Sequence, residues 1–199
     1  SLAIGTYSND CPGVNIKALV EGFILGSYTF DTYKSKKEPS KLEKIIICLD
    51  DYSRVDVSLE TATKALRSAT AVAEATNFAK EIVNATPQDM TPMTLADVAQ
   101  TLTSIPNVSC KVMDENFLKA QGMNAFLAVN RASVHPPRLI HLTYKPKEVK
   151  KRFVYVGKGL TYDSGGLSLK PSEHMVTMKA DKSGAAAVMA ILKGAATLE

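Results

Sequence analysis

The chain has 199 residues, of which 45% are hydrophobic and 22% charged, and its formal net charge at pH 7 is +4. These values are ordinary for a globular protein of about one to one and a half domains. No membrane span or signal peptide is expected, and the dispersed charge gives no indication of nucleic acid binding. The widely spaced Cys11, Cys48 and Cys110 favour core positions in a reducing, cytoplasmic compartment over a disulfide framework.

The first part of the sequence predicts two helices and one strand. Residues 1–13 are rich in turn formers, and apolar side chains at helical intervals then predict a helix over residues 14–26 or beyond. A charged loop follows, and the apolar run at residues 45–49 is typical of a buried strand. Ser58 is placed to cap a long helix that runs to about residue 83, with apolar residues at three- and four-residue steps.

The rest of the chain alternates strands with helices. Thr91 and Pro92 form a cap followed by a proline at the first helical position, which predicts a helix through about residue 102. Asp114 is placed to cap a short helix that Gly122 ends. Strands are predicted over residues 108–112, 125–129, 139–144 and 153–156, and a last helix over residues 185–198. This alternation indicates an α/β fold.

The stretch over residues 156–185 carries the clearest chemistry. It joins the last predicted strand to the last predicted helix, and its residues include the lysines Lys158 and Lys170 and the aspartates Asp163 and Asp181. Loops at the carboxyl ends of strands are where sites form in α/β proteins. Carboxylates on such a loop suit hard or borderline divalent metal ions, so a metal site is predicted here.

Two phosphate-binding motifs are absent from this stretch. A P-loop needs Ser or Thr after its lysine, but Lys158 is followed by Gly159. A dinucleotide fingerprint needs a third glycine at the position that Tyr162 occupies.

The residues of this stretch resemble the leucyl aminopeptidase family of two-metal exopeptidases. The resemblance lies in Gly-Lys-Gly-Leu-Thr-Tyr-Asp-Ser-Gly-Gly-Leu-Ser-Leu-Lys-Pro at 157–171, Met-Lys-Ala-Asp at 178–181 and Gly-Ala-Ala at 184–186. The spacings also match: five from Lys158 to Asp163, seven to Lys170 and eleven to Asp181. Fainter similarity extends back to residues 83–87, 127–129 and 136–140.

The resemblance implies a role for each matching residue. Asp163 would bridge two divalent ions, and Asp181 with Lys158 would bind the tighter one. A ligating lysine must be neutral, because an ammonium has no lone pair. Lys170 would stay charged and hydrogen-bond the substrate carbonyl or the developing oxyanion as metal-activated water attacks the scissile carbonyl. Met178 would line the pocket for the first side chain and favour leucine or other apolar residues.

The resemblance further implies a soluble cytoplasmic homohexamer that cleaves peptides, with zinc, manganese or magnesium as the two metal ions. Its expected organisation is an α/β fold with the end of a small amino-terminal domain at 1–56, a linker helix at 57–83 and the start of a mixed-sheet catalytic domain at 84–199. The family's Asn-Thr-Asp-Ala-Glu-Gly-Arg motif, with further metal carboxylates and an arginine that holds bicarbonate, has no match in this sequence. The chain is therefore expected to be a fragment that is inactive alone.

Two other functions are weighed against the metallopeptidase. The first is a non-catalytic binding or assembly protein that retains half of the site, with DNA binding as one form. The second is an enzyme that forms a Schiff base through Lys158 or Lys170, which borohydride trapping with a carbonyl substrate would detect. The three histidines show no metal-binding spacing, and only His174 lies in the central stretch.

Overall fold

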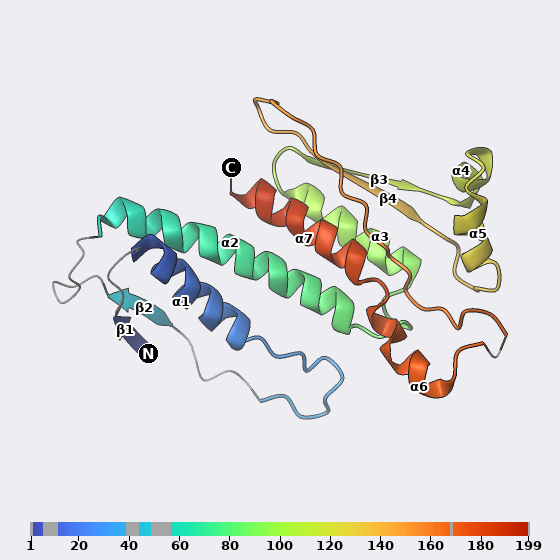
Figure 1. The fold of residues 1–199 in the computed structure, drawn as a ribbon, viewed down its shortest axis with the longest axis horizontal. Coiled ribbons are helices and arrows are strands. Elements are labelled where there is room, and N and C mark those ends of the chain that lie inside the picture. The colour runs from blue at the N-terminus through green and yellow to red at the C-terminus, as the bar shows by residue number, and fades with distance from the viewer. Residues whose placement is uncertain (1, 6–11, 39–43, 49–56, 168, 199) are drawn as a thin grey trace. The chain divides into compact units, whose positions relative to one another are not determined.

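The computed structural model describes residues 2–5, 12–38, 44–48, 57–167 and 169–198, and it contains two compact units. The first unit comprises residues 1–77 with residue 198, and the second comprises residues 78–197 with residue 199. The elements in chain order are β1 (Leu2–Gly5), α1 (Pro12–Gly26), β2 (Ile45–Cys48), α2 (Leu59–Asn84), α3 (Pro92–Thr101), η1 (Leu102–Ser104), β3 (Val108–Met113), α4 (Glu115–Ala120), α5 (Asn124–Asn130), β4 (Leu139–Tyr144), α6 (Ser172–Met175), η2 (Val176–Ala180) and α7 (Ser183–Thr197) (Figure 1). This content confirms the predicted α/β class, while the domain boundaries at 56/57 and 83/84 stay predictions.

The first unit combines a parallel strand pair with one buried cluster from α1 and α2. Strand β1 pairs with β2 so that Leu2 lies opposite Ile45. The buried residues of the cluster are Ile16, Val20, Ala62, Ala65 and Ala69. The cluster partners of α1 on α2 are all alanines, so burial here depends on small side chains that allow a close approach.

Most predictions for this unit are confirmed. The long helix begins after Ser58, whose hydroxyl oxygen accepts a hydrogen bond from the Thr61 amide at 3.2 Å. The helix predicted over residues 14–26 is α1, and the strand over 45–49 is β2, with Leu49 outside the described residues. The turn prediction for residues 1–13 is wrong at β1, because parallel pairing with β2 is a non-local interaction that local composition does not reveal.

The second unit is built around an antiparallel strand pair. Strands β3 and β4 pair from Val108 opposite Tyr144 to Met113 opposite Leu139, which confirms both predicted strands. Helices α3 and α7 both contact this pair (Figure 1). The buried core consists of Ile82, Leu95, Ala99, Leu102, Val108, Ala186, Met189 and Ala196.

The predicted caps in this unit are confirmed. Thr91 and Thr94 form a capping box at the start of α3, with Pro92 in the first turn. The Asp114 carboxylate accepts from the Phe117 amide at 3.0 Å, and Gly122 follows α4 with a φ of 63°. These short-range hydrogen bonds fix where both helices begin.

Two predicted strands are absent from the structure. Residues 125–129 lie in helix α5, because a short apolar run does not distinguish a strand from a helix. Residues 153–156 form no strand, and their side chains are 60–93% exposed instead of buried. A strand needs a hydrogen-bonded neighbour, and no pairing with the described residues involves this segment.

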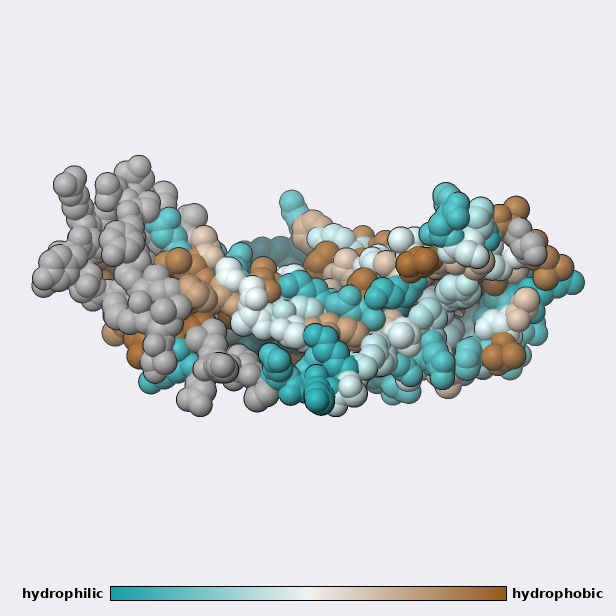
Figure 2. Space-filling model, turned by 90° about the horizontal axis from the view of Figure 1, so that it is seen from below, coloured by the Kyte–Doolittle hydropathy of each residue, from teal (hydrophilic) through white to brown (hydrophobic). Residues whose placement is uncertain are grey.

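The described surface carries both apolar and polar residues. On the face shown in Figure 2, apolar residues form separate patches among polar ones. None of the helices in the described part of the chain is long and apolar enough to cross a membrane.

Candidate metal centre

A close backbone crossing places the central loop beside the start of α7. A Cβ atom on Gly157 would lie 2.2 Å from the carbonyl oxygen of Gly184, a separation that side-chain atoms do not tolerate. The Ala185 amide donates to the Lys158 carbonyl at 2.8 Å across the same crossing. Both glycines are therefore required for the approach that sets Lys158 beside Asp181.

Replacing Gly157 with alanine is expected to destabilise the protein by about 1–3 kcal/mol, because the new methyl group overlaps backbone atoms. Gly22→Ala is the matched control, since a Cβ there meets nothing within 4 Å. Gly22 lies inside α1, so its replacement should stabilise the protein by about 0.5–1 kcal/mol. Urea unfolding of both variants checks the prediction, and equal stabilities would contradict the tight crossing.

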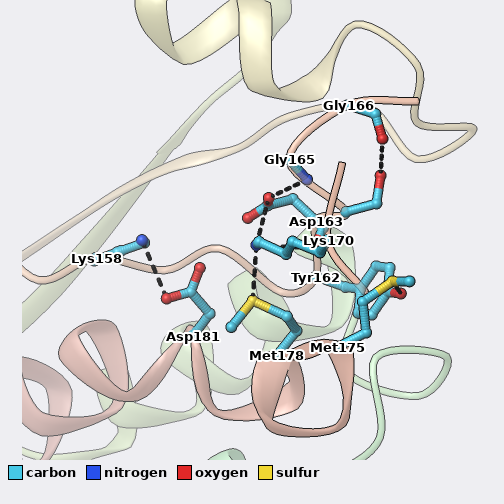
Figure 3. Close-up of polar contacts among 10 residues, drawn as sticks. Lys158, Tyr162, Asp163, Gly165, Gly166, Lys170, Met175, Met178 and Asp181 are labelled. Carbon is cyan, nitrogen blue, oxygen red and sulfur yellow. Dashed lines mark hydrogen bonds and ion pairs between the residues drawn. The ribbon is translucent and has the colours of Figure 1, made fainter. Parts of the chain in front are cut away.

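The first charged pair joins Lys158 to Asp181. The Lys158 Nζ lies 3.1 Å from Asp181 Oδ1 (Figure 3). The Lys158 side chain is 59% exposed, whereas that of Asp181 is 19% exposed. Asp181 directly follows η2, and its amide donates to the Met178 carbonyl at 3.1 Å. The carboxylate is therefore the fixed partner and the lysine the more accessible one.

The second charged pair joins Lys170 to Asp163. The Lys170 Nζ donates to Asp163 Oδ1 at 2.8 Å and to its carbonyl at 3.2 Å, and both side chains are half-buried (Figure 3). The Gly165 amide also donates to Asp163 Oδ1, at 2.8 Å. Gly165 has a φ of 75°, a left-handed conformation that suits glycine in this turn.

Electrostatics link the two pairs. The hydrogen bond from Lys170 is the largest influence that holds the pKa of Asp163 below its ordinary value, and burial acts in the opposite direction. The Gly165 amide and the charges of Lys170 and Lys158 lower this pKa further. The two pairs lie next to each other in the close-up view, so the four predicted side chains form one charged cluster (Figure 3).

Two methionine sulfurs attach the loop to the following helical segment. Lys170 Nζ donates to Met178 Sδ at 2.9 Å, and the Tyr162 hydroxyl donates to Met175 Sδ at 3.0 Å (Figure 3). Met178, predicted to line a side-chain pocket, thus contacts the lysine predicted to meet the substrate carbonyl. The contact from Tyr162 to Met175 was not predicted, because isolated methionines and tyrosines give no sequence signal of pairing.

The donor set of the cluster fits divalent metal ions. Asp163 and Asp181 are acceptor-only groups, and each already faces a cationic group in the structure. Neutral Lys158 would add a nitrogen donor. Within the described residues, His, Cys, Asp and Glu side chains form no group of three that could hold a metal ion. The candidate ligands in this part of the chain are thus two carboxylates and one amine.

The burial and contacts of Lys182 are the main feature of the site that the sequence reasoning did not predict. Its side chain is fully buried, and its Nζ donates to main-chain carbonyls. The sequence did contain one signal. Lys182 directly precedes the last helix, where a residue with a side-chain acceptor usually caps the first amides, and lysine has no such acceptor.

Comparisons with known proteins identify the family of the chain. Residues 77–199 match the family described as "Cytosol aminopeptidase family, catalytic domain". A probable cytosol aminopeptidase of Campylobacter jejuni is 53% identical over the whole chain, and one of Helicobacter hepaticus is 52% identical over 91% of it. The chain spans 41% and 37% of these relatives.

A solved structure shows the same fold. The bottromycin maturation enzyme BotP in complex with Mn has a TM-score of 0.77 and 35% identity over 93% of this chain and 37% of its own. The match over residues 77–199 includes all four charged residues of the cluster. The chain belongs to the cytosol aminopeptidase family.

Proposed function

We propose that the protein is a metal-dependent aminopeptidase that releases leucine or other apolar residues from the amino terminus of peptides. The observation that carries the proposal is the gathering of Lys158, Asp163, Lys170 and Asp181 into one cluster. The same four residues have the spacing that the resemblance requires, and they lie in the region that matches the family.

Asp163, Asp181 and Lys158 would hold the metal ions. The similar BotP structure is a complex with Mn, which supports a divalent metal for this chain as well. Lys158 is more than half exposed, so its side chain can leave its ion pair, and two adjacent dications would favour the neutral amine that ligation requires. When bound, the metal ions supply Lewis-acid polarisation of the scissile carbonyl and a nucleophile from water at neutral pH.

Further carboxylates are needed to complete a two-metal site. Three side chains offer too few donors to replace most of the hydration of two dications. Two positive ions a few ångströms apart also repel each other unless several carboxylates offset their charge. We infer that other parts of the natural protein contribute the remaining ligands.

Lys170 is suited to the substrate carbonyl. Its ammonium is held by Asp163 and Met178, so its position is set before the substrate arrives. A fixed donor aimed at developing negative charge lowers the barrier without reorganisation during the reaction.

The preference for the first residue would follow from two features. A free amino terminus that has lost its proton offers a lone pair to the metal ions, whereas the lone pair of an internal peptide nitrogen is delocalised into its carbonyl group. Met178 is half-buried and unbranched, so it would adapt to an apolar first side chain.

Hydrolysis of leucyl-p-nitroanilide by the full natural protein tests the proposal. N-acetyl-leucyl-p-nitroanilide is the matched control, because its amine is blocked. We expect cleavage of the first compound only, loss of activity with a chelator and recovery on addition of Mn²⁺ or Zn²⁺. Equal cleavage of both compounds, or activity that survives complete metal removal, would contradict the proposal.

A further inference from the structure

We propose that Lys182 is a positioning residue that fixes Asp181 for metal binding, an inference that rests on the proposed function. Among the described residues, Lys182 is the one charged side chain that is fully buried. Lysine is almost never fully buried unless its ammonium is paired. Its burial one residue after a predicted metal ligand therefore needs a specific reason.

The ammonium of Lys182 binds three main-chain carbonyl oxygens. Its Nζ lies 2.9 Å from the Ala85 oxygen, 2.5 Å from that of Lys179 and 3.5 Å from that of Val83. An ammonium has three N–H donors, so these contacts satisfy it. None of its partners among the described residues is a carboxylate, so the side chain joins backbone segments and does not form an ion pair.

The bound carbonyls lie at the ends of two helical elements. Val83 and Ala85 flank Asn84, the last residue of α2, and Lys179 lies near the end of η2. The last carbonyls of a helix have no amide partner inside the helix and carry partial negative charge. A buried cation is favourable there, and it draws the two helix ends together.

Asp181 lies between two points of this attachment. Lys179 provides a carbonyl to the ammonium, and Lys182 provides the ammonium itself, so the backbone is held on both sides of Asp181. The Lys182 carbonyl also accepts from the Ala186 amide at 3.1 Å, which begins α7. The Lys182 side chain thus fixes the Asp181 backbone against the end of α2, and the Lys182 main chain continues into the first turn of α7.

This attachment matters because the side chain that faces Asp181 is far more exposed than Lys182. Lys158 is 59% exposed, and an ion pair with an exposed lysine is expected to restrain the carboxylate only weakly. Partners that orient a metal ligand commonly change metal affinity by about 10–100-fold when they are removed. We therefore expect Lys182 to control the affinity for the ion that Asp181 binds.

Lys182→Met in the full natural protein tests the inference, because methionine keeps an unbranched chain but removes all three donors. Lys179→Met is the matched control: it removes a nearby exposed ammonium and leaves the bound carbonyl intact. Two measurements are made on each protein. Hydrogen exchange of the metal-free protein follows the Asp181 and Ala185 amides, and titration with Mn²⁺ alone gives the affinity for each ion.

In Lys182→Met, we expect exchange at the two amides to accelerate by about tenfold or more, because hydrogen bonds from a charged group are lost. The affinity for one Mn²⁺ should fall by about 10–100-fold, with a smaller change at the other ion. Lys179→Met should resemble the wild type in both measurements. If Lys182→Met does not fold, Lys182→Gln replaces it, and its two remaining amide donors should give changes in the same direction.

Unchanged exchange would overturn the attachment, and faster exchange with unchanged Mn²⁺ affinity would overturn the positioning role. A wild-type protein that takes up no Mn²⁺ would overturn the proposed function itself. Because exchange is measured without metal, these failures are distinguishable.

Discussion

Replacing Lys170 with alanine in the full natural protein should lower turnover by about 10²–10³-fold, the usual loss for one oxyanion partner. The metal content should stay close to that of the wild type, because Asp163, Asp181 and Lys158 remain. The physical reason is that Lys170 is a charged donor held in place by Asp163 and Met178, and not a ligand. Steady-state kinetics and elemental analysis of the same preparation check both parts.

Lys119→Ala is the matched control for this variant. Lys119 also pairs with a carboxylate, that of Glu115 at 2.6 Å, but both side chains are exposed on α4. An exposed pair of this kind contributes little to stability, about 0.3–0.5 kcal/mol, and turnover should be unchanged. Loss of both metal ions in Lys170→Ala would contradict the assigned role.

Asp163→Asn should release both metal ions, a fall of about two metal equivalents per chain, if Asp163 bridges them. Asparagine is nearly isosteric and keeps an oxygen that can accept from the Gly165 amide, so the turn should persist. What is lost is the negative charge that offsets repulsion between two dications. Activity should fall with the metal content, and excess Mn²⁺ should restore little of it.

Asp181→Asn distinguishes a ligand of one ion from a bridge between both ions, because it should release mainly the tighter ion. Asp97→Asn, an exposed position on α3, is the control and should keep both ions. Elemental analysis after dialysis distinguishes the variants. Full occupancy of both sites in Asp163→Asn would show that Asp163 is not the bridge.

The sequence predicted helix starts well because caps are local. Ser58, Thr91 and Asp114 each bond an amide three residues away, so the signal and the structure lie in the same few residues. The strand predictions were less successful because pairing depends on distant residues. An apolar run became helix α5 at residues 125–129, and another at residues 153–156 has no strand partner among the described residues.

The site was also predicted only in part, because sequence spacing is local and the pairing of side chains is not. The spacing of Lys158, Asp163, Lys170 and Asp181 indicated one cluster, but not that Lys158 faces Asp181 while Lys170 faces Asp163. Those partners depend on the crossing of Gly157 and Gly184, which brings separate segments together.

Lys182 was missed for a related reason. Its ammonium meets the Ala85 carbonyl 97 residues earlier in the chain. No local pattern around Lys182 reveals that contact, and a lysine in isolation is most often a solvated charge.

Anomalous diffraction from crystals of the full natural protein grown with Mn²⁺ tests the central claim most directly. We expect two manganese peaks that share Asp163, one of them also bound by Asp181 and the Lys158 nitrogen. Lys170 should remain unligated and beside Asp163. Peaks away from these residues, or a Lys158–Asp181 ion pair that persists with manganese bound elsewhere, would contradict the proposed metal centre.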